Sequence, residues 1–412
     1  MVYLMHSVKP HICFVAPNAY AAISGRHDLS HIGGAEVQQA MLAKGLVQCG
    51  HEVDIITLDH GQPHVECYDG VRTLRMCKPN AGYPGLKFLH PRLTSLWSAL
   101  SRSNAEVYYQ RTTGVETGQV AIWCHFHKRP FLFAVANDTN CDPRLPDLKR
   151  VHERWLYRWG LRHTARVICQ TQSQAAAMRD HFDRDSIVIP NGARDPLNGT
   201  PPTKLLSSGP TRRILWVGRF GSKKRLEWLL TLAEHCQDLA FDVAGDGNHD
   251  DPYVTGLKTR AQHIPNVFLH GRVPHGQMGE FYDRADLLVS TSHVEGFPNT
   301  FLEAWSRGLP TVSTFDPDNV IQNNTLGLVA HSLKQLKEEV EFLFRTPNQW
   351  LTCSRRARAY FLNNHSITTT VQSLSSLLCS LAPGQVNHGD DVPVSTNAPA
   401  VHAPTAGRGR PS

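Results

Sequence analysis

The stretch EGFPNTFLE, residues Glu295 to Glu303, has a carboxylate at each end. The apolar residues 285–290 before it predict a buried parallel strand, and the residues after Pro298 predict a helix. The first N–H groups of a helix are free and its dipole is positive there, so the intervening turn suits a diphosphate. Glu303 can accept hydrogen bonds from paired hydroxyls, such as those of a ribose. An acidic first helical turn is the ordinary alternative for Glu303 alone, but the strand–turn–helix context favours a binding site.

Other segments follow a matching order along the chain. Residues 214–226 read as a strand that ends in Gly218 and Arg219, and Lys224 follows five residues later. The remaining segments are a Gly-Gly loop at 32–36, a strand and turn at 242–247, and a strand and loop at 267–274. With the Glu295–Glu303 stretch, they resemble the retaining glycosyltransferases of family 4. That family has the GT-B fold, two facing Rossmann-like doubly wound domains with a cleft between them, and uses nucleotide-sugar donors. The resemblance covers residues 11–381 and is strongest from 213 to 313.

The resemblance implies roles for the residues that match the family's motifs. Glu295 is expected to act at the transferred sugar and Glu303 at the ribose, with the base against the loop that contains Val273. The donor-binding positions implied in this way are Gly33, Gly34, Gly218, Val273, Gly296, Phe297, Pro298, Asn299 and Glu303.

Positive charge is expected where the leaving diphosphate gains negative charge. We find no Asp-x-Asp motif of the kind that holds a metal there in the other nucleotide-sugar fold, so we predict neither metal nor cofactor. Arg219 and Lys224 are expected to stabilise the leaving group instead. A solvated helix start is the alternative for Lys223, Lys224 and Arg225. Arg219, however, directly follows a buried strand and a glycine, where open α/β sheets bind ligands.

The connection between the first predicted strand and the helix from Ala35 is long, about eighteen residues. Gly33 and Gly34 at its end let the backbone approach a phosphate and present amides at the helix start. Residues 18–31 are polar, and we expect a flexible loop that contacts the acceptor or closes over it.

Composition limits the class of protein. A chain of 412 residues with 41% hydrophobic residues can form two domains. Its ten scattered cysteines and the absence of a signal peptide predict free thiols in the cytoplasm. No apolar run approaches the roughly 18 residues of a membrane-spanning helix. The net charge of +6 is compatible with anionic small molecules or an anionic membrane. His125 and His127 have no nearby carboxylate to complete a metal site.

Apolar runs alternate with helical patterns in both halves, which predicts parallel sheets with helices on both faces. We assign residues 1–192 to an acceptor-binding domain, 193–212 to a linker, 213–382 to a nucleotide-sugar-binding domain and 383–412 to a disordered tail. The resemblance implies that the last helix, 366–381, crosses back to the first domain. First-half strands are predicted at 11–16, 52–58, 105–109, 131–136, 166–169 and 186–189, and helices at 35–49, 92–102, 115–127, 146–163 and 172–182.

One position departs from the family's pattern. Many relatives have a histidine just after the strand that here ends at Ala136, and this chain continues with Asn137 and Asp138. Asp138 is a candidate to orient or deprotonate an acceptor hydroxyl. Capping of the next helix is an equal alternative.

The segment 144–166 has seven Arg/Lys and two acids, which gives 7 − 2 = +5, with Trp155, Tyr157 and Trp159 interleaved. Such a segment can contact an anionic membrane or a lipid-linked phosphate. The alternative is an ordinary helix that buries Leu148, Val151, Trp155 and Trp159, which the i, i+3 and i+4 spacing favours. Nucleic-acid binding has no motif in support.

These observations predict a metal-independent retaining glycosyltransferase that moves a hexose-type sugar from a UDP- or GDP-sugar to a glycan or lipid-linked acceptor. Surface or exported polysaccharide is the expected product class, because the family mostly works there. The expected location is the cytoplasm, with peripheral contact at the inner face of the membrane left open. The alternatives are a nucleotide-sugar epimerase or hydrolase, and a non-catalytic nucleotide-sugar binder, on the same fold.

Overall fold

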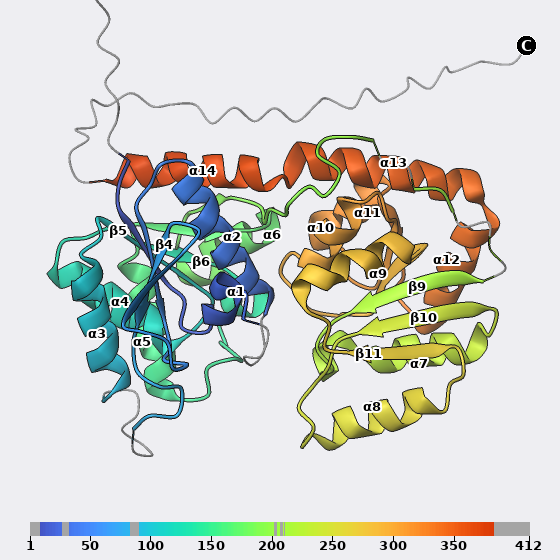
Figure 1. Ribbon diagram of the computed structural model, residues 1–412, viewed down its shortest axis with the longest axis horizontal. Helices are drawn as coiled ribbons and strands as arrows, with labels where there is room; N and C mark the ends of the chain where they lie inside the picture. Colours follow the sequence, from blue (N-terminus) through green and yellow to red (C-terminus); the bar gives the residue numbers. More distant parts are fainter. Residues whose placement is uncertain are drawn as a thin grey trace, which may run out of the picture.

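The structure is a computed structural model, and it describes residues 9–26, 33–82, 90–201, 204–206, 209 and 211–382. The tail 383–412, for which disorder is predicted, lies outside the described residues. Two α/β lobes, each built on its own sheet, stand side by side (Figure 1). The fold class predicted from the sequence is confirmed.

The first lobe contains an eight-stranded sheet of order β3-β4-β2-β1-β5-β6-β7-β8. Its strands are β1 (Ile12–Val15), β2 (Val53–Thr57), β3 (Val65–Tyr68), β4 (Val71–Arg75), β5 (Val107–Arg111), β6 (Phe131–Ala134), β7 (Arg166–Cys169) and β8 (Ser186–Val188). All neighbours are parallel except β3, which pairs antiparallel with β4 at the edge. The expectation of a purely parallel sheet was therefore wrong for this hairpin. The hairpin's two turn residues, Asp69 and Gly70, both have positive φ (50° and 81°).

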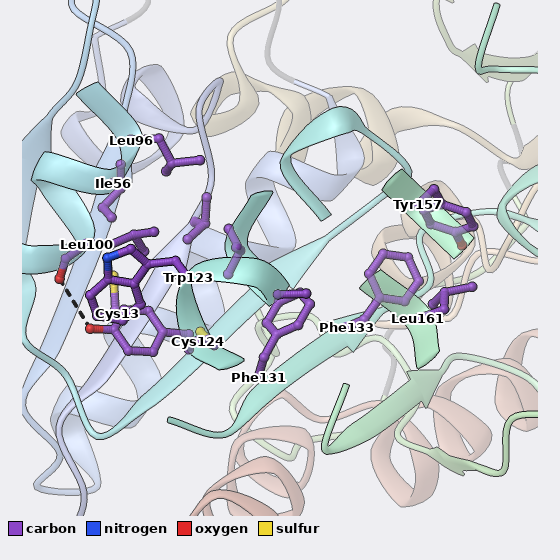
Figure 2. Packing of buried hydrophobic residues seen from close by; sticks show 14 of the residues in the cluster. Cys13, Ile56, Leu96, Leu100, Trp123, Cys124, Phe131, Phe133, Tyr157 and Leu161 are labelled. Carbon is purple, nitrogen blue, oxygen red and sulfur yellow. Dashed lines mark hydrogen bonds between the residues drawn. The ribbon is translucent and has the colours of Figure 1, made fainter. Parts of the chain in front are cut away.

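Helices cover both faces of this sheet. They are α1 (Tyr20–Ser24), α2 (Gly34–Gln48), α3 (Arg92–Ser103), α4 (Val115–Phe126), α5 (Val151–Arg162) and α6 (Gln172–Phe182), with a short 3₁₀ helix η1 (Asp138–Cys141). Alternate strand residues point to opposite faces. Cys13 of β1 therefore lies with Leu100 of α3 and Trp123 of α4 (Figure 2), and Val15 belongs to the same core cluster. Ile12 and Phe14 belong to the cluster on the other face, with residues of α1 and α2.

Helix α1 forms part of the connection that follows β1. The sequence predicted a flexible polar loop over 18–31. Instead, Tyr20 and Ile23 of α1 are buried, and the Tyr20 hydroxyl donates to Glu66 Oε2 at 3.1 Å. The apolar side chains at 20 and 23 hold this part of the connection on the sheet. Residues 27–32 lie outside the described part.

Helix α5 begins at Val151, five residues after the predicted start. Helix α5 approaches α4 closely: a Cβ on Gly118 would meet Leu156 O at 2.5 Å, and one on Gly160 would meet Thr117 O at 2.9 Å. This contact determines which face of α5 is buried. Tyr157, Gly160 and Leu161 are buried, and Trp159 packs partly against the core. Val151 and Trp155 point outward, so the expectation that they are core residues was wrong.

The second lobe contains a six-stranded parallel sheet of order β11-β10-β9-β12-β13-β14. Its strands are β9 (Arg212–Val217), β10 (Leu239–Ala244), β11 (Val267–Gly271), β12 (Leu287–Ser290), β13 (Thr311–Ser313) and β14 (Gly327–Val329). Helices α7 (Leu226–His235), α8 (Pro252–Gln262) and α12 (Leu333–Arg345) pack on one face. The other face is covered by α9 (Met278–Arg284), α10 (Asn299–Trp305), α11 (Val320–Asn324) and α13 (Pro347–Asn364).

The last helix, α14 (Ile367–Leu381), continues from α13 across to the first lobe and lies along α2 (Figure 1). Val371 fills the space beside Gly45, where an added Cβ would lie 2.5 Å from its side chain. A hydrogen bond joins His51 Nε2 to the Ser375 hydroxyl (2.7 Å). No helix in the described part of the chain combines the length and apolarity needed to cross a bilayer.

Candidate active site

The turn before α10 lies against the first lobe. A Cβ on Gly296 would meet Ala136 O at 2.7 Å and Asn137 Cα at 3.1 Å, so glycine lets the two backbones touch. The Asp138 N–H is 3.4 Å from Glu295 O. Glu295 therefore lies between the carboxyl ends of β12 and β6, where the two sheets face each other.

Lys224 and Glu295 form an ion pair across the carboxyl ends of β9 and β12. Both side chains are partly exposed, at 27% and 18%. The Thr291 hydroxyl donates to Lys224 O, and Arg225 Nε donates to Thr291 O at 2.8 Å, so hydrogen bonds hold the two strand ends together. The structure thus brings together a predicted cation and a predicted carboxylate that are 71 residues apart.

Arg219, the second predicted cation, lies on the same strand end but is exposed. It forms no ion pair with any residue that the structure describes. Gly218 lies beside it, with the Lys224 side chain 3.5 Å from where a Cβ would be. Arg219 is therefore the more accessible of the two cations for a ligand that enters the cleft.

Asn299, at the start of α10, joins this helix to the predicted glycine loop. Its Nδ2 donates to Gly34 O at 3.0 Å, and Gln38 Nε2 donates to its Oδ1 at 3.2 Å. Gly33 is the N-cap of α2. Since the first amides of a helix lack intrahelical partners, two helix starts from different lobes present positive ends to the same region.

A cavity of 570 Å³ lies between α1 and α2 on one side and α9 and α10 on the other. Glu303 lines it together with Asn299, Gln38 and His275. The Glu303 Oε1 is 3.6 Å from His275 Nδ1. The volume is in the range of small-molecule sites, about 300–1,000 Å³. Glu303 is thus available to a ligand in this cavity. Val273, in the loop predicted to hold the base, packs against the core beside α9.

Asp138 is half-buried just after the end of β6. Gln174 Nε2 donates to its Oδ1 at 2.9 Å. Burial raises the pKa of Asp138 to about 6; the Gln174 hydrogen bond opposes this, and the charges of Glu295 and Asp318 add to it. The capping alternative is wrong, because Asn137 is the N-cap of η1.

We expect Asp138→Asn to stabilise the protein in a pH-dependent way. The folded-state pKa lies above the ordinary value, so the folded state binds the proton more tightly and stability falls as pH rises from about 4 to about 6. The variant removes this penalty and should gain about 3 kcal/mol near pH 8 and little near pH 4. Urea unfolding at both pH values measures it, with Asp180→Asn, an exposed carboxylate on α6, as control. Equal gains at both pH values would contradict the titration.

Several polar residues that join the lobes were missed by the sequence analysis. Gln170 Oε1 accepts from the Phe297 N–H at 3.1 Å, and Asn191 Nδ2 donates to Phe297 O at 3.2 Å. Asp318 accepts from the N–H groups of Gln172 (2.7 Å) and Ser173 (3.0 Å), so a carboxylate of the second lobe caps α6 of the first. Gln170 directly follows a buried strand, a signal that could have identified it; Asp318 has no such signal.

In the described segments, no three His, Cys, Asp or Glu side chains gather as a metal site requires. His127 instead stacks on Trp123, and His125 contacts Trp159 and His163.

Comparisons with known proteins cover both lobes. Residues 33–192 match the family described as "Glycosyl transferase 4-like domain", and residues 211–346 match "Glycosyl transferases group 1". Sucrose-phosphate synthase from Thermosynechococcus elongatus superposes with a TM-score of 0.74 at 16% identity, over 90% of this chain and 98% of its own. The chain is a GT-B glycosyltransferase.

This glycosyltransferase is also similar to Anabaena HepE in complex with UDP and glucose, with a TM-score of 0.72 and 16% identity over 90% of this chain and all of that one (100%). It is 26% identical over 315 residues to an uncharacterized glycosyltransferase of Methanocaldococcus jannaschii; this alignment covers 68% of this chain and 76% of the relative. Several other relatives align with the glycosyltransferase over 65% of their own length or less.

Proposed function

We propose that this glycosyltransferase transfers a hexose-type sugar from a UDP- or GDP-sugar to a glycan or lipid-linked acceptor, with retention and without a metal. The observation that carries the proposal is the Lys224–Glu295 pair, set between the two sheets and facing Asp138 of the other lobe. Cytoplasmic synthesis of surface or exported polysaccharide is the setting that we propose. The bound UDP of the Anabaena neighbour supports a nucleotide donor.

The second lobe is the proposed donor side. A diphosphate would gain negative charge as the sugar leaves, and Arg219, Lys224 and the start of α10 supply positive charge for it. Glu303 would hold the ribose from the wall of the cavity. Contact between the lobes around Gly296 would exclude water, which otherwise hydrolyses the donor.

Retention follows from the roles of these groups. An inverting reaction needs a base on the face of the sugar opposite the diphosphate, and Asp138 is the one candidate among the predicted site residues. The negative charges of Glu295 and Asp318 raise the pKa of Asp138 further. A retaining reaction needs no such base, because the leaving phosphate oxygen can take the acceptor proton.

The test is the anomeric configuration of the product. We expect an α-glycoside from an α-linked UDP- or GDP-sugar, measured by the anomeric coupling in NMR. A β-linked product, with activity lost in Asp138→Asn, would show that Asp138 is the base of an inverting enzyme.

The two alternatives differ in what happens to the donor. A panel of UDP-, GDP- and ADP-sugars identifies the donor by thermal shift, since a ligand at a hundredfold excess over its dissociation constant stabilises by about 2.7 kcal/mol. An epimerase or hydrolase would consume that donor without an acceptor, and a binder would leave it intact. Acceptor-dependent release of the nucleotide is the result that supports transfer.

A further inference from the structure

The outer face of α5 exposes two large apolar side chains. Val151 is 83% exposed and Trp155 is 59% exposed. They are four residues apart and therefore lie on the same side of the helix. Exposure of apolar surface to water is unfavourable, and apolar surface that adjoins polar residues commonly marks an interaction site.

Cations surround this pair. Lys149, Arg150, Arg154, Arg158 and Arg162 are all exposed, and none forms an ion pair within the described part of the chain. Arg154 and Arg158 donate to the backbone oxygens of Leu148 (2.9 Å) and Pro143 (2.8 Å), which fixes the side chains without neutralising them.

Position and charge place these groups on one surface. Arg158 and Arg162 follow Val151 by seven and eleven residues, so they extend the stripe that Val151 and Trp155 begin. Glu153 is the one acid of α5, and its carboxylate accepts from the Arg150 N–H at 3.0 Å at the start of the helix. We call the surface formed by Lys149, Arg150, Val151, Arg154, Trp155, Arg158 and Arg162 the α5 face.

We propose that the α5 face docks on an anionic lipid bilayer. Unpaired cations attract anionic headgroups, and tryptophan, with an apolar ring and a polar N–H, is suited to the boundary between headgroups and acyl chains. Each cation near such a surface strengthens binding about fivefold. Five cations and an apolar pair fit this occupant in both charge and polarity.

The α5 face also adjoins the cleft. Asp147, in the loop before α5, is 3.4 Å from Lys223 Nζ of the second lobe and accepts a hydrogen bond from the Thr139 hydroxyl. Thr139 is the residue after Asp138. A bilayer on the α5 face would therefore lie beside the loop that leads to Asp138, where a lipid-linked acceptor would enter; this last step rests on the proposed function.

Co-sedimentation with vesicles tests the docking without any sugar transfer. We expect the full chain to bind vesicles of phosphatidylcholine and phosphatidylglycerol, to bind pure phosphatidylcholine weakly, and to dissociate in high salt. Trp155→Ala should weaken binding on the order of tenfold. Lys149→Glu with Arg162→Glu should weaken it about 25-fold or more.

Matched controls come from α12 of the second lobe. Phe342→Ala removes an aromatic side chain of similar exposure (46%), and Lys334→Glu reverses an exposed charge. Both should bind the vesicles like the parent chain. Thermal unfolding checks that every variant is folded.

Three results would overturn the proposal. They are equal binding to both kinds of vesicle, unchanged binding of the α5 variants, and binding to a short nucleic acid that exceeds vesicle binding and depends on the same residues. Transfer to an acceptor free of lipid reports on the proposed function separately, because Trp155, Lys149 and Arg162 lie outside the candidate active site.

Discussion

Lys224→Ala and Arg219→Ala are each expected to lower kcat by about 10²–10³ without unfolding the protein. A cation aimed at the charge that develops on a leaving diphosphate acts mainly in the transition state, so the loss falls on kcat rather than on substrate affinity. Lys224 is partly buried and paired with Glu295, whereas Arg219 is exposed. Steady-state kinetics with the donor identified by thermal shift measures both.

Lys223→Ala is the matched control, since Lys223 is the neighbour of Lys224 and contacts Asp147 rather than Glu295. It should retain turnover within a few-fold. Near-normal turnover of both the Lys224 and the Arg219 variants would contradict a mechanism that depends on fixed cations. Complete loss of the parent enzyme's activity in EDTA would contradict it as well, because it would show that a metal is needed.

The strands and helices that could be predicted are those whose apolar periodicity agrees with their burial. The predicted helices 35–49 and 172–182 correspond to α2 and α6 within one residue. The hairpin of β3 and β4 was missed because β3 has exposed and half-buried side chains and so lacks a clear apolar pattern. Its Asp69-Gly70 turn is nevertheless a strong hairpin signal, and it could have revealed the pair.

Helix α5 shows why periodicity alone did not identify its buried face. Apolar residues follow helical spacing on two sides of it, through Val151 and Trp155 and through Tyr157 and Leu161. Packing of Gly160 against α4 decides between the two sides, and that contact joins residues far apart in the chain. Such a choice depends on the tertiary structure.

The candidate site likewise has a part that the sequence predicts and a part that depends on the tertiary structure. The ends of buried strands predicted the place of Glu295 and Lys224, and their contact follows from the neighbouring positions of β9 and β12 in the sheet. The contacts between lobes, such as Asp318 at the start of α6, depend on how two separate sheets face each other. No local pattern encodes that orientation.

Substitution of the two glutamates should affect different quantities, donor affinity for Glu303 and kcat for Glu295. Glu303 lines the cavity, and within the described residues its carboxylate forms no ion pair with a lysine or arginine; His275 Nδ1 lies 3.6 Å away. Its carboxylate is therefore available to the hydroxyls of a ribose. We expect Glu303→Ala to weaken donor affinity about 10- to 100-fold, as loss of hydrogen bonds to a charged group does, with a smaller change in kcat.

Glu295→Ala should do the opposite and lower kcat on the order of 10²-fold while donor affinity stays the same or increases. The ion pair explains the direction of the change in affinity. In the free enzyme Glu295 holds Lys224, and its removal releases the lysine to bind the diphosphate more tightly in the ground state. Isothermal titration with the donor, beside kcat, measures both quantities for each variant.

The double variant Glu295→Ala/Lys224→Ala provides the sharper test of this coupling. Residues in direct contact give non-additive effects, so the combined loss in kcat should be smaller than the product of the two single losses. Independent, multiplicative effects would show that the pair seen between the strands does not act as a unit. Effects exchanged between the glutamates, with affinity lost in Glu295→Ala and turnover lost in Glu303→Ala, would overturn the assignment of Glu295 to the sugar and Glu303 to the ribose.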